Sequence, residues 1–319
     1  MKKRNIIIAM VLAMAMTTVG GATVFAADEK AEGNGYTIAY VPTTMNNPFW
    51  TAMMGGIKEE MEAKGMDVDK QLVTVDANSD QATMNNYVND LIAQQVDAII
   101  LAPMDCTAVT EALTACEEAG IPVINVDTAV DATDKVVSII ASDNYKAGVE
   151  CAEDMMSKLD KGAKIAVMNQ PSGTACVQRE KGFLDTAGDY FEIVSTTDTE
   201  GDTAKTMTAA EDVLTADDDL AGFFCINDMG ALGCVQAAQA AGKEDLLIYG
   251  VDGNPDFMGY VADGSATASA AQQPSVIGQK ALDAAIDTLD GKEVEHDQVV
   301  DVVLINKDNI ADFDVTDWQ

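Results

Sequence analysis

The chain has 319 residues, of which 53 are acidic and 19 are basic, so its formal net charge is −34. A surface of this sign repels nucleic acids and anionic membranes, and we expect no nucleic-acid partner. The single histidine, His296, lies in a charged segment near the end of the chain, which argues against a histidine-based catalytic triad and a His-rich metal site. The six cysteines include no C-x-x-C pair, which argues against a zinc or redox motif, and the sequence does not assign disulfides among them.

The first residues have the organisation of an export signal. Residues 2–4 are basic, residues 6–16 form an apolar run, and residues 24–26 provide a small-residue cleavage site. The apolar run is shorter than the roughly 20 residues that a membrane span requires. We therefore expect residues 1–26 to be a signal peptide and the mature protein to be soluble, in the periplasm or outside the cell. Retention of the segment as an uncleaved anchor is the alternative.

The first strand of the mature chain leads into a polar turn and then a helix. Residues 38–41 form a short apolar strand, and Pro48 has the fixed φ that suits the first turn of a helix. In open α/β sheets, ligands bind outside the carboxyl ends of the strands. Phe49 and Trp50 beside Asn47 therefore indicate a ligand with an apolar face and a hydroxylated edge. The alternative is a capped helix whose two rings fill the core.

Along the rest of the chain, short apolar runs alternate with longer amphipathic ones. The predicted strands are 71–75, 98–101, 122–126, 136–140, 164–168, 192–195, 221–226 and 247–251, and the predicted helices are 79–94, 108–119, 144–159, 175–187, 203–215 and 229–241. This alternation predicts βαβ units, and it restarts at residue 164. Because two such series exceed one compact sheet, we expect an α/β fold of two doubly wound parallel-sheet domains that face each other.

Motifs for nucleotides and for nucleophilic catalysis are absent from the sequence. No G-x-G-x-x-G or G-x-x-x-x-G-K-[ST] follows a strand, and there is no G-x-S-x-G. A nucleotide-dependent enzyme or a serine hydrolase therefore has little support.

Polar side chains instead follow the predicted strands, and Arg179 lies one turn into a predicted helix. The strand-end residues are Asp127, Asn227, Asp228, Asp252 and Gln272. Each could be a turn former or a helix cap, which is the alternative for any one of them. Together these carboxylates, amides and one guanidinium both donate and accept hydrogen bonds, as a neutral polyol does, and they lack the acid and base of a hydrolase. We expect a binding protein without catalytic residues, metal or cofactor.

These motifs resemble the periplasmic sugar-binding proteins of the ribose-binding type, over residues 36–307. The motifs that carry the resemblance are TTMNNPFW at 43–50, LAPMD at 101–105, IPVINVD at 121–127, SDN at 142–144, QREKGF at 178–183, IND-x-x-ALG at 226–233, YGVDGNPD at 249–256 and AAQQPSVIG at 270–278. The resemblance implies a periplasmic-binding-protein type I fold whose two lobes are joined by a three-strand hinge near Ser142, Gln272 and Asp301. It places residues 36–142 and 273–301 in the first lobe, and 143–272 and 302–319 in the second.

The resemblance also implies the ligand contacts and the partner. The implied contacts are Thr43, Asn47, Phe49, Trp50 and Asp127 from the first lobe, Arg179, Asn227 and Asp252 from the second, and Gln272 at the hinge edge. Two positions depart from the ribose pattern: Thr128, which we also expect to contact the ligand, stands where an arginine is expected, and Glu200 and Gly201 stand where an aromatic residue is expected. These changes enlarge the expected pocket, so the expected ligand is a monosaccharide or related cyclic polyol.

The expected function is delivery of that ligand by a monomeric protein to the membrane subunits of an ABC permease. A sensor that presents its closed form to a chemoreceptor or sensor kinase is the alternative, and the sequence does not separate the two uses. A sugar-responsive repressor would need an N-terminal DNA-binding segment where this chain has an export signal. An exported glycoside-acting enzyme would be revealed by turnover of a sugar.

Overall fold

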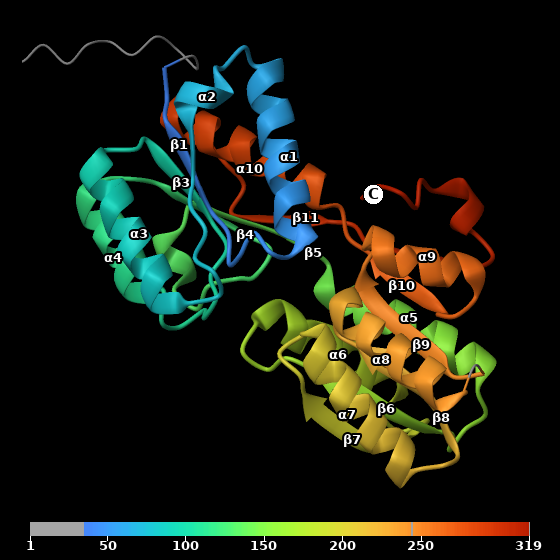
Figure 1. Cartoon of the computed structure of the whole chain (residues 1–319). Helices are drawn as coiled ribbons and strands as arrows, with labels where there is room; N and C mark the ends of the chain where they lie inside the picture. Colours follow the sequence, from blue (N-terminus) through green and yellow to red (C-terminus); the bar gives the residue numbers. More distant parts are fainter. Residues whose placement is uncertain (1–34, 244, 319) are drawn as a thin grey trace, which may run out of the picture. The chain divides into compact units, whose positions relative to one another are not determined.

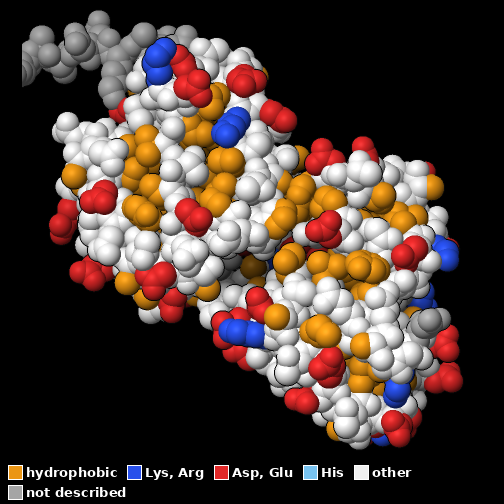
Figure 2. Space-filling model, viewed as in Figure 1, with side chains coloured by type: hydrophobic (Ala, Val, Ile, Leu, Met, Phe, Trp, Pro, Cys, Tyr) orange, Lys and Arg blue, Asp and Glu red, His pale blue; other side chains and the backbone are white. Residues whose placement is uncertain are grey.

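The computed structural model describes residues 35–243 and 245–318, and the predicted signal peptide, 1–26, lies outside this part of the chain. The described residues form two lobes, each built on a six-stranded sheet that helices cover on both faces (Figure 1). Within the described residues, no helix has the length and apolar character needed to cross a membrane. Acidic side chains are spread over the face shown in Figure 2, where basic ones are few.

The first lobe contains a parallel sheet with the strand order β11-β5-β4-β3-β1-β2. Its strands are β1 (Ile38–Val41), β2 (Leu72–Thr74), β3 (Ala98–Leu101), β4 (Val123–Val126), β5 (Ser138–Ser142) and β11 (Asp297–Val300). Its helices are α1 (Pro48–Ala63), α2 (Val68–Gln71), α3 (Gln81–Gln94), α4 (Thr110–Ala119), α10 (Pro274–Leu289) and the short η1 (Thr133–Lys135). Successive strand residues point to opposite faces, so Tyr40 packs under α1 and α10 while Val41 packs under α3 and α4.

The second lobe repeats this arrangement with the strand order β12-β10-β9-β8-β6-β7. Its strands are β6 (Lys164–Asn169), β7 (Glu192–Asp198), β8 (Leu220–Cys225), β9 (Leu247–Asp252), β10 (Ala268–Ala271) and β12 (Val303–Asn306). Its helices are α5 (Asn144–Lys158), α6 (Thr174–Ala187), α7 (Thr203–Ala216), α8 (Asp228–Ala241), α9 (Pro255–Asp263) and the short η2 (Ile310–Asp312). The sheet is parallel except that its edge strand β12 runs antiparallel to β10. The predicted fold of two parallel-sheet α/β lobes is confirmed.

The chain passes between the lobes after β5, after β10 and between β11 and β12. These passages fall at the crossovers that the sequence places near Ser142, Gln272 and Asp301. The lobe boundaries drawn there stay a prediction.

At two of the predicted element starts that differ, the local structure shows the reason. The helix expected from residue 79 begins at Gln81, because the Asp80 carboxylate accepts a hydrogen bond of 2.6 Å from the Thr83 N–H and caps it. The strand expected from residue 71 begins at Leu72, because Gln71 ends α2. All six cysteines are free thiols, and Cys116, Cys151 and Cys225 are buried.

Two glycines allow α5 and α6 to approach closely. A Cβ on Gly148 would lie 2.0 Å from the carbonyl oxygen of Arg179, and one on Gly182 would lie 2.0 Å from that of Tyr145. Because helix backbone cannot yield locally, we expect Gly148→Ala to lower the free energy of unfolding by about 1–3 kcal/mol and to displace Arg179. Urea denaturation measures the change.

The matched control is Gly259→Ala in α9, where an added Cβ would meet nothing within 4 Å. Alanine is favoured over glycine inside a helix, so this variant should gain roughly 0.5–1 kcal/mol. Equal stability of the two variants would contradict the close α5–α6 contact.

Candidate functional site

A cavity of about 170 Å³ lies where strands of both sheets end. Every residue that the sequence proposes as a ligand contact lines it: Thr43, Asn47, Phe49, Trp50, Asp127 and Thr128 from the first lobe, Arg179, Asn227 and Asp252 from the second, and Gln272 after β10. Parallel strands deliver their carboxyl ends to the same edge of a sheet, which explains why residues so distant in sequence meet here. That they contact a ligand stays a prediction.

The start of α1 forms an apolar wall of the cavity. Asn47 caps the helix, since its Oδ1 accepts a hydrogen bond of 3.0 Å from the Phe49 N–H, and Pro48 takes the first helical position. The rings of Phe49 and Trp50 meet edge to face, with centroids 5.0 Å apart. Both belong to the buried core under α1 and α10 and also line the cavity. The core-filling and ligand-facing interpretations of these rings therefore apply together.

Asp127 stands on a strained turn directly after β4. Its φ is +60°, a conformation that few non-glycine residues adopt, and its N–H donates to the Ile140 carbonyl at 2.9 Å. Oδ2 of Asp127 accepts a hydrogen bond of 2.8 Å from the Thr128 hydroxyl. The buried Asn125 amide fixes the turn, donating to the Thr128 carbonyl at 2.9 Å and accepting from the Val130 N–H at 3.0 Å. Asn125 is a supporting residue that the strand-end pattern does not reveal.

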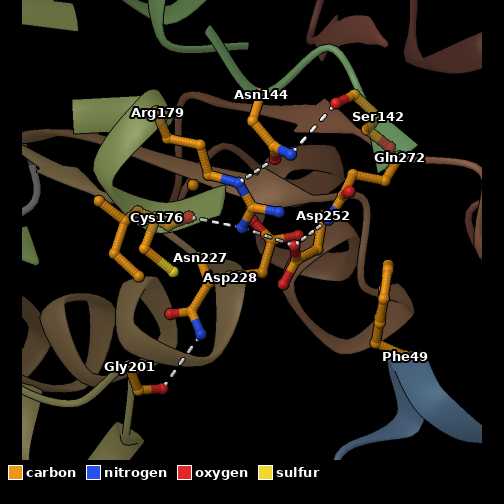
Figure 3. A network of polar contacts seen from close by, with 12 residues as sticks. Phe49, Ser142, Asn144, Cys176, Arg179, Gly201, Asn227, Asp228, Asp252 and Gln272 are labelled. Atoms are coloured by element: carbon orange, nitrogen blue, oxygen red, sulfur yellow. Dashed lines mark hydrogen bonds and ion pairs between the residues drawn. The ribbon is translucent and has the colours of Figure 1, made fainter. Parts of the chain in front are cut away.

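A buried polar network centred on Arg179 forms the opposite wall (Figure 3). Its Nε donates to Asn144 Oδ1 at 2.7 Å, and its Nη1 donates to the Ile226 carbonyl at 2.9 Å and to Asp252 Oδ1 at 3.2 Å. Asp252 Oδ1 also accepts a hydrogen bond of 2.7 Å from the Gln272 amide. Arg179 and Asp252 are 4% and 5% exposed, so the pair is removed from water. The network joins α6, β9 and the start of α5 to the passage after β10.

Two buried carboxyls at this site are influenced by the charge of Arg179, and one of them, Asp252, forms an ion pair with it. Burial raises the pKa of Asp252 to about 6, while Arg179 and Gln272 oppose the shift. Burial also raises the pKa of Asp127, and the positive charge of Arg179 opposes this. The carboxyl of Asp252 therefore titrates near neutral pH inside the cavity.

Other strand-end residues have structural roles. Asn227 caps α8, since its Oδ1 accepts a hydrogen bond of 2.9 Å from the Gly230 N–H. Its amide also donates a hydrogen bond of 3.2 Å to the Gly201 carbonyl. It therefore acts as the helix cap of the alternative interpretation while it lines the cavity. Asp228 is fully buried and accepts hydrogen bonds from the Ser269 hydroxyl at 2.8 Å and the Asn254 N–H at 2.7 Å, outside the cavity lining.

The cavity has further lining residues that the sequence did not nominate as contacts. They are Thr44, Ser79, Pro103, Met104, Gln170, Gly173, Ala175, Cys176, Glu200 and Gly201. Gln170 follows β6, so the strand-end rule could have found it. The Glu200 side chain is 66% exposed and pairs with Lys205 at 2.6 Å, which fits an exposed loop acid.

Two acceptor atoms of the cavity residues are buried without a hydrogen-bond partner, Asp127 Oδ1 and Gln272 Oε1. Leaving a buried acceptor unpaired costs about 1–3 kcal/mol, and most buried polar atoms in native proteins have a partner. Both atoms require a donor, and a hydroxyl group supplies one.

The lobes and the cavity define a two-lobed α/β protein that holds a small polar ligand. The chain belongs to the family described as the periplasmic binding protein domain, whose family model matches residues 38–293. It is 36% identical over 261 residues to the ribose import binding protein of Bacillus subtilis (strain 168), covering 82% of this chain and 84% of that protein.

Solved structures of solute-binding proteins of ABC transporters are also similar. One from Agrobacterium vitis with bound D-fucose is 31% identical with a TM-score of 0.80, covering 86% of this chain and 96% of that one. One from Actinobacillus succinogenes 130z with bound D-allose is 27% identical with a TM-score of 0.80, covering 87% of this chain and 100% of that one. The resemblance inferred from the motifs is confirmed.

Proposed function

We propose that this protein is exported, captures a neutral monosaccharide or related cyclic polyol in its cavity, and delivers it as a monomer to the membrane subunits of an ABC permease. The observation that carries the proposal is the pair of partnerless buried acceptors, Asp127 Oδ1 and Gln272 Oε1, in a cavity with an aromatic wall. Ring hydroxyls would donate to these atoms, and Phe49 and Trp50 would cover an apolar sugar face. The ribose, fucose and allose named for its relatives are ligands of this class.

Binding would favour the arrangement in which both lobes reach the ligand. The first lobe contributes Asp127 and the aromatic wall, and the second contributes Arg179 and Asp252. At the rim, the Thr174 hydroxyl of the second lobe donates to the Ala129 carbonyl of the first at 3.0 Å. A ligand shifts a hinge equilibrium by its differential affinity for the two states, and a permease can then recognise the ligand-bound shape.

Calorimetric titration against pentoses, hexoses and inositols tests the proposal. We expect at least one ring-shaped ligand to bind, and at about 100 times its Kd to raise the free energy of unfolding by about 2.7 kcal/mol. The matching open-chain alditol, which has one more hydroxyl than the cyclic sugar but no ring, should bind more weakly. Absence of binding across the panel, or consumption of the sugar by the pure protein, would contradict the proposal.

A further inference from the structure

The segment after β12, residues 307–318, contacts the cores of both lobes. Ile310, Phe313 and Val315 pack against the core of the second lobe, under α7, α8 and α9. Trp318 packs against the core of the first lobe, under α1 and α10. The family match ends at residue 293, so this segment lies beyond it. The chain therefore returns to the first lobe after its third passage.

The contact that Trp318 makes in the first lobe is with the aromatic wall of the cavity. Its ring meets Phe49 edge to face, with centroids 5.7 Å apart and an interplanar angle of 74°. Phe49 in turn meets Trp50 edge to face, so the three rings form a continuous row. These separations lie in the range in which aromatic pairs attract each other. Trp318 itself is not among the residues that line the cavity.

Local hydrogen bonds order the turn that presents Trp318. The Asp314 carboxylate accepts from the Thr316 N–H at 3.0 Å and from the Thr316 hydroxyl at 2.6 Å, and the Asp317 carboxylate accepts from the Trp318 N–H at 2.8 Å. A side chain held by an ordered turn loses less freedom when it packs, so the contact with Phe49 is more favourable than one from a free chain end.

We propose that Trp318 is a positioning residue for ligand binding, which holds the Phe49 ring against the cavity from a segment anchored on the other lobe. This role rests on the proposed capture of a sugar at the same site. Because the anchors are on the second lobe and Phe49 is on the first, separating the lobes breaks the ring contact or pulls the anchors from their core. The contact thus stabilises the arrangement in which both lobes line the cavity, and the ligand gains affinity from it.

Calorimetric titration of Trp318 variants with the sugar identified above tests this role. Trp318→Ala should weaken binding roughly 2- to 12-fold, the range that one edge-to-face aromatic pair provides. The matched control, Trp318→Phe, keeps an aromatic edge and should recover most of the affinity. A merely structural role predicts a lower midpoint of thermal unfolding with an unchanged Kd.

A second measurement reads the contact directly, because the chain has only two tryptophans. Protein labelled with 5-fluorotryptophan should give two ¹⁹F resonances, and the one missing from Trp318→Phe belongs to Trp318. Phe49→Leu should shift this resonance in the absence of any sugar, because a ring is removed from its neighbourhood. Addition of sugar to the wild type should shift it as well, although Trp318 does not line the cavity.

The outcomes separate this role from the proposed function. Wild-type binding of a sugar together with an unchanged Kd for Trp318→Ala overturns the positioning role alone, as does a Trp318 resonance that neither Phe49→Leu nor sugar moves. A wild-type protein that binds no sugar overturns the proposed function and the positioning role with it. Weakened binding that phenylalanine restores, with both resonance shifts, supports the role.

Discussion

Arg179→Ala should weaken sugar binding by about 100-fold or more. The variant loses the charged hydrogen bonds that the guanidinium would give to the ligand, each worth roughly 1.5–3 kcal/mol, and two such bonds correspond to at least this factor. It also releases Asp252 and Asn144, which Arg179 holds at 3.2 and 2.7 Å. Isothermal titration with the cognate sugar measures the loss.

The same variant should lose stability for a separate reason. Asp252 is 5% exposed, and without Arg179 its carboxylate is buried with no cation. Removing one partner of a buried ion pair lowers the free energy of unfolding by about 3–5 kcal/mol. The double variant Arg179→Ala/Asp252→Asn removes the orphan charge, so it should recover part of this stability while still failing to bind sugar.

The matched control is Lys181→Ala, two residues along the same helix. Lys181 pairs with Asp185 at the surface, where its side chain is 55% exposed, and surface pairs contribute little. This variant should keep wild-type affinity and stability. Wild-type-like titration of Arg179→Ala, or binding restored in the double variant, would contradict the assigned role of Arg179.

Part of the cavity lining was predictable because one rule places polar residues after the strands. Short apolar runs mark the strands, parallel pairing gathers the carboxyl ends, and a polar residue after each end then points to a common edge. Asp127, Asp252 and Gln272 follow directly from this rule. It does not state what each side chain does, so Asn227 and Asp228 look alike in sequence although one lines the cavity and the other is locked in the second-lobe interior.

The supporting contacts were not predictable, because they depend on packing between elements far apart in the chain. Arg179 is held by Asn144, which lies 35 residues earlier. Trp318 reaches Phe49 across almost the whole described chain, and only tertiary structure brings the two rings together. Close approach of helices, as at Gly148, also leaves no periodic signal, since a glycine in a helix pattern indicates only a local weakness.

Lowering the pH from about 7.5 to about 5 should weaken sugar binding through Asp252 and, through the same group, stabilise the free protein. The pKa of this carboxyl rises from 3.8 to about 6 on burial, so the folded state holds the proton more tightly than the unfolded state. Its protonation therefore adds stability as the pH falls through about 6, and the gain is complete below 3.8, at about 3 kcal/mol. Asp127, whose pKa burial also raises, contributes with the same sign.

Lowering the pH has the opposite effect on sugar binding, which it weakens. A protonated Asp252 is a weaker acceptor for a ligand hydroxyl and a weaker partner for Arg179, so affinity should fall by up to about tenfold at one pH unit below its pKa. Asp252→Asn should bind weakly at every pH and lose this dependence, and its difference in unfolding free energy from the wild type should shrink as the pH falls. Asp256→Asn, at an exposed position on α9, is the matched control and should keep the wild-type profile. A wild-type affinity that is the same at both pH values would show that the charge of Asp252 does not act on the ligand.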